Sequence, residues 1–177
     1  MITRLRRLLA DERGYTLIEL LQVTVILGVI MGALTTVFVR AMNAELEMNK
    51  RFTSQQEARI AVDKMRREVH CARLVSPAGA SASITVTLPV GCPGAPSAET
   101  TVVYATQLVS TNRYKLNRNS VRVADYITTS SVFTYTAQST SSLAKLNVNL
   151  PVNSKPAETG KTWRLNADIV LRNSTRS

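Results

Sequence analysis

The sequence predicts an α+β protein in which a long N-terminal helix, membrane-spanning in its first half, packs with its second half on an antiparallel β-sheet. Three observations predict this fold. Residues 14–39 are an apolar run with one charged side chain, residues 40–74 contain neither Gly nor Pro, and beyond residue 76 apolar and polar side chains alternate. Alternation with a period of two is typical of strands that have one face covered.

Residues 1–14 are expected to be a short cytoplasmic leader. Their charges are mostly basic: Arg4, Arg6, Arg7 and Arg13 against Asp11 and Glu12. Because basic residues remain on the cytoplasmic side of a spanning segment, residues 40–177 are expected outside the cytoplasm. The apolar run is far longer than that of a secretory signal peptide, and residues 39–42 offer no convincing cleavage site, so the helix should remain in the mature protein.

Residues 15–39 are expected to cross the cytoplasmic membrane. As a helix, the apolar run is roughly 37 Å long, and the hydrocarbon core of a bilayer is about 30 Å thick. A carboxylate costs about 2.5–3.5 kcal/mol at the membrane centre and less near its edge, so Glu19 calls for a functional explanation. The alternative is that Glu19 merely extends to the cytoplasmic interface of a plain anchor.

Residues 40–76 are expected to form the exported, amphipathic half of the same helix. Apolar side chains spaced by three and four residues give one face that should pack on the sheet: Ala58, Val62, Met65, Val69 and Ala72. Three charge pairs are spaced for i,i+4 contacts: Glu47 with Arg51, Asp63 with Arg67, and Lys64 with Glu68. The helix should end near Leu74, because Ser76-Pro77 and Gly79 stop it.

Residues 77–177 are expected to form a C-terminal β-sheet domain. Segments rich in Thr, Val and Tyr predict strands at 84–88, 102–105, 114–116, 121–127, 132–135, 146–150 and 163–171, with a turn at 109–112. Pro, Gly, Ser and Asn gather in expected loops at 89–98, 138–142 and 151–161.

The sequence gives little support for catalysis. The single histidine, His70, has no accompanying cluster of ligands, and Cys71 beside it would point in another direction on a helix. We therefore expect no enzyme activity, no cofactor and no metal site.

The residues from Gly14 to Leu21, Gly-Tyr-Thr-Leu-Ile-Glu-Leu-Leu, resemble the class III signal of type IV prepilins and pseudopilins. Gly28 also lies where these proteins commonly place a glycine. The resemblance implies a type IV pilin-like fold, cleavage between Gly14 and Tyr15 by the prepilin peptidase/methyltransferase, and N-methylation of Tyr15. It also implies that Glu19 serves assembly with other pilin or pseudopilin subunits on a membrane assembly platform.

Cleavage would supply a partner for Glu19. It creates a cationic α-amino group on Tyr15, four residues before Glu19. A carboxylate buried in a bundle of such helices needs a cation, and the N-terminus of a neighbouring subunit can provide it. The pair would fix the axial register between subunits, so leader removal and assembly would be coupled.

The exported part resembles the larger minor pilins and the J-type minor pseudopilins in its order of elements. Short fragments reminiscent of these proteins are Gln55-Gln56-Glu57-Ala58-Arg59 through Met65, and Val170-Leu171-Arg172-Asn173. They favour a minor subunit over a major one. Whether the filament serves as a pilus, in type II secretion or in DNA uptake (competence) stays open, and with it a final location at the cell surface or in the periplasm.

The chain has two cysteines, Cys71 near the end of the helix and Cys92 in the loop 91–94. Both are expected on the exported side, where disulfides persist. A bond between them would contribute roughly 3 kcal/mol by closing a loop of about twenty residues. Two free thiols are the alternative, because geometry decides the pairing.

Nucleic acid is a candidate partner because the chain is basic, with a net charge of +10. Four cations surround Tyr114 and Tyr126, a pattern that can hold phosphates while aromatic rings stack on bases: Arg113, Lys115, Arg118 and Arg122. A solvated strand face is the alternative, which we favour because scattered basic residues are weak signals.

Two functional hypotheses follow. The first is a minor pilin or pseudopilin that is extracted from the membrane into a filament. The second is a stand-alone, membrane-anchored extracellular binding module that never polymerises, with DNA as its candidate ligand.

Overall fold

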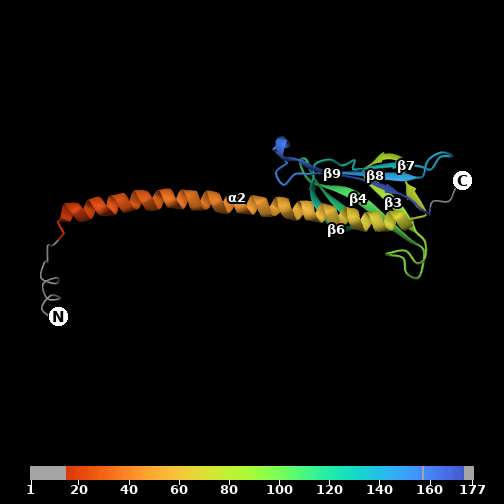
Figure 1. Cartoon of the computed structure of the whole chain (residues 1–177), viewed down its shortest axis with the longest axis horizontal. Helices are drawn as coiled ribbons and strands as arrows, with labels where there is room; N and C mark the ends of the chain where they lie inside the picture. Colours follow the sequence, from red (N-terminus) through yellow and green to blue (C-terminus); the bar gives the residue numbers. More distant parts are fainter. Residues whose placement is uncertain (1–14, 157, 174–177) are drawn as a thin grey trace, which may run out of the picture. The chain divides into compact units, whose positions relative to one another are not determined.

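The computed structural model describes residues 15–156 and 158–173, and it contains a long helix followed by an antiparallel sheet (Figure 1). Helix α2 runs from Leu17 to Cys71 without interruption. The chain divides into two compact units, Met1–Leu46 and Glu47–Ser177, and α2 contributes to both. The predicted α+β architecture is confirmed.

The strands in the described part of the chain are β1 (Leu74–Ser76), β2 (Gly79–Ser81), β3 (Ser83–Leu88), β4 (Thr100–Ser110), β5 (Arg113–Arg118), β6 (Val121–Ile127), β7 (Phe133–Thr136), β8 (Lys145–Val152) and β9 (Trp163–Val170). A short 3₁₀ helix, η1 (Thr159–Lys161), lies between β8 and β9. The order in the sheet is β1-β3-β4-β5-β6-β8-β7-β2, and β9 pairs with β8. Every pairing is antiparallel, as the alternating pattern predicts.

Strand β8 joins the two parts of the sheet. Along one edge it pairs with β9 over its whole length, while along the other edge its first half pairs with β7 and Val152 at its end pairs with Ile127 of β6. The expected loop at 151–161 is therefore partly wrong, because residues 151 and 152 belong to β8.

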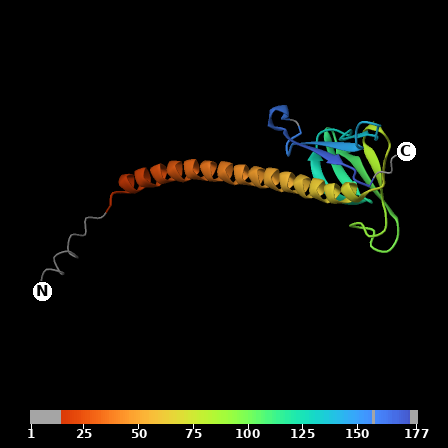
Figure 2. The same ribbon diagram turned by 45° about the vertical axis from the view of Figure 1, so that its right-hand side comes forward.

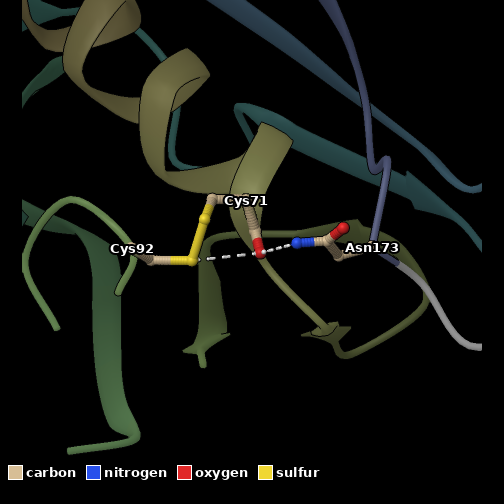
Figure 3. The surroundings of a disulfide bond; sticks show 3 residues. All are labelled: Cys71, Cys92 and Asn173. Carbon is tan, nitrogen blue, oxygen red and sulfur yellow. Dashed lines mark hydrogen bonds between the residues drawn. A yellow bond between two sulfur atoms is a disulfide. The ribbon is translucent and has the colours of Figure 1, made fainter. Parts of the chain in front are cut away.

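Helix α2 ends earlier than the sequence predicts. Cys71 is its last residue, and Leu74–Ser76 pair with β3 as strand β1. The end is capped from far along the chain: Arg172 N donates to His70 O over 3.4 Å, and the Asn173 amide donates to Cys71 O over 3.1 Å (Figure 3). Such donors satisfy carbonyls that have no partner within the helix, so the helix can end at Cys71.

The predicted apolar stripe is buried. Figures 1 and 2 show the corresponding part of α2 lying along the sheet. Its five residues, Ala58, Val62, Met65, Val69 and Ala72, are at most 3% exposed. They belong to one hydrophobic cluster with the inward side chains of the strands, including Ile84, Tyr104 and Leu146. The period of the apolar residues in the helix therefore predicted the core correctly.

The predicted charge pairs are confirmed in one case of three. Arg51 pairs with Glu47, but Asp63 pairs with Arg66 at 3.5 Å and not with Arg67. Glu68 is 3% exposed and turns away from Lys64. A buried carboxylate needs hydrogen-bond donors, and Glu68 finds them in the sheet.

Three donors meet the Glu68 carboxylate. Arg118 Nε lies 3.0 and 3.2 Å from its two oxygens, Arg118 Nη2 lies 2.9 Å from Oε1, and the Tyr104 hydroxyl donates to Oε2 over 2.7 Å. Burial raises the pKa of the Tyr104 phenol, and the neighbouring Glu68 carboxylate raises it further. The partly buried Glu68–Arg118 ion pair thus joins the helix to β5, and the hydrogen bond from Tyr104 joins it to β4.

We predict that Met65→Ala lowers the free energy of unfolding by about 2–5 kcal/mol, since it leaves a cavity in a site that is 0% exposed. Ile60→Ala is the matched control, because Ile60 lies on the same helix and is 58% exposed. Urea unfolding of both variants in detergent, followed by tryptophan fluorescence, measures the difference. Equal losses in the two variants would contradict the assignment of this face to the core.

Candidate functional site

The first half of α2 presents apolar side chains on every side. All residues from 15 to 46 are exposed, and the large apolar side chains between Leu17 and Val39 are 49–85% exposed. An 18-residue window has a mean hydropathy of 2.2 with no buried residue, so the helix is long and apolar enough to cross a membrane. A helix that is apolar all round requires lipid or other helices around it.

The threonine hydroxyls of this segment are satisfied within the helix. Thr24 donates to Leu21 O over 2.9 Å, Thr35 to Met31 O over 2.8 Å and Thr36 to Ala33 O over 2.7 Å. Because hydrocarbon offers no partner, such internal bonds let hydroxyl groups reside in a membrane. These threonine hydroxyls therefore need no hydrogen-bond partner from a second molecule.

Two polar side chains of the segment differ from the threonines. Within residues 15–156 and 158–173, neither the Glu19 carboxylate nor the Gln22 amide has a hydrogen-bond or ion-pair partner. Their spacing of three residues places them on the same face of the helix. Gln22 was not among the residues predicted from the sequence, although its spacing of three from Glu19 within an apolar run could have indicated it.

Helix α2 begins immediately after the predicted cleavage position. Thr16 Oγ1 accepts a hydrogen bond from Glu19 N over 3.3 Å, and Thr16 O accepts one from Leu20 N over 3.2 Å. Thr16 is thus the N-cap, but no capping box forms, because the Glu19 carboxylate accepts no bond from Thr16 N among the described residues. Tyr15 precedes the cap and is 78% exposed, while Gly14 and the rest of the leader lie outside the described residues.

The structure places Arg113 and Arg118 in contact with acids. Arg113 donates to both oxygens of Asp125 over 3.1 and 2.8 Å, and its guanidinium carbon lies 4.1 Å from the centre of the Tyr126 ring. Burial opposes ionisation of Asp125, but hydrogen bonds from Arg113 and from the Tyr126 backbone outweigh it and lower the pKa of the carboxyl. Arg118 is held by Glu68, as described above.

Of the other two predicted DNA-binding cations, Arg122 is exposed and Lys115 is half-buried. Arg122 lies 3.3 Å from Asp125 and 3.8 Å from Glu57. Lys115 has no ion-pair partner within the described part of the chain. Three of the four cations are therefore already paired with carboxylates, and DNA binding stays a prediction.

Cys71 and Cys92 are joined by a disulfide, with their Cα atoms 5.9 Å apart (Figure 3). The bond links the last residue of α2 to the loop between β3 and β4. The neighbouring His70 Nδ1 lies 2.8 Å from Val170 O and therefore donates to it. Among the residues that the structure describes, no three His, Cys, Asp or Glu side chains gather as a metal site.

The comparison with protein families gives a match in the N-terminal segment of the chain. A family model described as the prokaryotic N-terminal methylation motif matches residues 9–35. Searches of curated proteins and of solved structures gave no significant match to the chain. The matched residues include the end of the leader, the predicted cleavage position and Glu19, and they end within α2.

Proteins with this motif have a structural rather than a catalytic role. The apolar helix fits a membrane-anchored pilin. The motif is one that implies processing by prepilin peptidase and assembly with other pilins. Residues 9–35 of this chain therefore carry the prokaryotic N-terminal methylation motif, the class III signal of type IV prepilins, and this motif supports a type IV pilin-like substrate of prepilin peptidase.

Proposed function

We propose that the protein is a minor subunit of a type IV pilus-like filament or of a pseudopilus for type II secretion or DNA uptake. One observation carries the proposal: the methylation motif leads directly into a helix whose side chains are exposed on every side up to Leu46. Helices of this kind bury their apolar surface against one another once they leave the lipid. The protein therefore acts by being extracted from the membrane and packed laterally.

In this proposal, residues 1–14 are removed after Gly14, Tyr15 is N-methylated, and residues 15–39 hold the subunit in the cytoplasmic membrane until extraction. The new amino group remains cationic after methylation. It forms an ion pair with the Glu19 carboxylate of a neighbouring subunit. Both groups lie among apolar helices, where the low dielectric makes an unpaired charge costly. Only one axial offset between two helices satisfies both groups, so the ion pair sets the register.

Gln22 extends this polar contact by one helical turn. An amide in hydrocarbon gains from a hydrogen bond across a helix interface, worth about 1–2 kcal/mol in model peptides. Because Glu19 and Gln22 share a face, the same neighbouring helix can satisfy both. The threonines, whose hydroxyls bond within the helix, are not part of the contact.

A minor rather than a major role is supported by the exported unit. Long connections follow β3, β7 and β8, at residues 89–99, 137–144 and 153–162. Apart from η1, their described residues form no helix and no named strand. A bulk subunit needs a compact surface that can be repeated along the filament. Irregular connections suit a subunit that initiates, tips or decorates a filament.

Mass spectrometry of the purified native protein tests processing. We predict an N-terminal peptide that begins at Tyr15 and carries one methyl group on its amine. Replacing Gly14 with Leu should leave residues 1–14 attached and keep the chain in the membrane, because the cation for Glu19 is then missing. A native chain that retains Met1 would contradict the proposal and favour the membrane-anchored binding module.

The role of Glu19 is tested by Glu19→Gln. We predict that processing continues but that recovery of the subunit in sheared filament fractions falls about tenfold or more, as expected for the loss of at least 1.4 kcal/mol per contact. Glu45→Gln is the matched control, since Glu45 is an exposed acid on the same helix beyond the apolar run. Recovery that is unchanged by Glu19→Gln, or lowered equally by both variants, would contradict the proposed pairing.

A further inference from the structure

The loop between β3 and β4 covers the buried ion pair of Glu68 and Arg118. A methyl group on Gly94 would lie 3.1 Å from Arg118 Nη2 and 3.7 Å from Glu68 Oε1, so Gly94 lies beside both charged groups with little room for a side chain. The side chains of Glu68 and Arg118 are 4% and 19% exposed. The loop therefore contributes to keeping water from this pair.

The disulfide fixes the part of the loop that forms this cover. Cys92, bonded to Cys71, is 4% exposed, and Ala95 is fully buried. Ala95 N donates to Cys92 O, and Gly91 N donates to Ala95 O, both over 2.9 Å. These bonds close a tight turn around Gly94, so the place of Gly94 over the ion pair depends on where Cys92 is held.

Water exclusion matters for this cluster. Two charges in a low-dielectric site attract each other strongly, but only complete hydrogen bonding offsets their loss of hydration. Glu68 meets that condition through Arg118 and Tyr104. If the cover opened, water would compete for the guanidinium and the carboxylate, and the link between α2 and strands β4 and β5 would weaken.

We propose that the loop at residues 89–95 shields the Glu68–Arg118 pair from water only when the Cys71–Cys92 disulfide is formed. The redox state of the two cysteines thus decides whether this cover is closed. Closing removes two protons and two electrons from the two thiols and passes them to a thiol–disulfide oxidant, whose disulfide becomes two thiols. In the reduced chain Cys92 is released, Gly94 moves off the pair and water enters. The unit Glu47–Ser177 therefore completes its packing only in an oxidising compartment, independently of whether the filament proposal holds.

Two glycine variants of the oxidised, full-length protein test the cover. Gly91 and Gly94 both have positive φ, +87° and +92°, so alanine strains the backbone at either position. A methyl group on Gly91 meets nothing within 4 Å, whereas one on Gly94 meets the ion pair. The readout is the rate at which Arg118 Nε–H exchanges with water, measured by NMR in detergent micelles and assigned by its loss in Arg118→Lys.

We expect Gly94→Ala to speed this exchange about tenfold and Gly91→Ala to change it less than about twofold. Reduction of the wild-type disulfide with dithiothreitol should speed it by a similar factor while the amides of β8 and β9 remain protected. Equal rates in the two glycine variants would overturn the proposal. So would a reduction that frees the amides of residues 91–95 without changing Arg118 Nε–H. If reduction unfolds the whole unit, the glycine comparison alone decides.

Discussion

The proposed assembly depends on the Glu19 carboxylate, which no cation in the described part of the chain neutralises. Glu19 lies in an apolar helical run and pairs with no cation among the residues that the structure describes. In water this is harmless, but in hydrocarbon an unpaired carboxylate is costly. A chain that keeps such a group in its membrane segment requires a partner that can bring a cation to that depth. In the proposed processing, removal of residues 1–14 would create such a cation at Tyr15, on the same segment of every processed copy.

The two units differ in how far their apolar side chains are covered by the chain itself. In Glu47–Ser177 the apolar face of α2 is covered by the sheet, the buried acid has three donors, and the helix end is capped by Arg172 and Asn173. From Leu17 to Leu46 nothing is covered. The described part of Glu47–Ser177 thus covers its own apolar surface, whereas the apolar half of the helix requires lipid or other helices around it.

The sequence predicted what depends on local periodicity and missed what depends on distant partners. Met65 and its neighbours were recognised as core because their spacing shows it, and the methylation motif was recognisable because its residues are contiguous. Glu68 was expected to pair with Lys64, but its partner Arg118 is fifty positions away in the chain. The early end of α2 at Cys71 and strand β1 likewise depend on residues 172–173 and on β3, which no local pattern reveals.

An atomic structure of the assembled filament would test the central claim most directly, through the distance between the Glu19 carboxylate and the Tyr15 nitrogen of adjacent subunits. Our account predicts that the two groups lie within about 4 Å across a subunit interface, the range of an ion pair. A Glu19 carboxylate that faces lipid or solvent, with the neighbouring amine bound elsewhere, would contradict it.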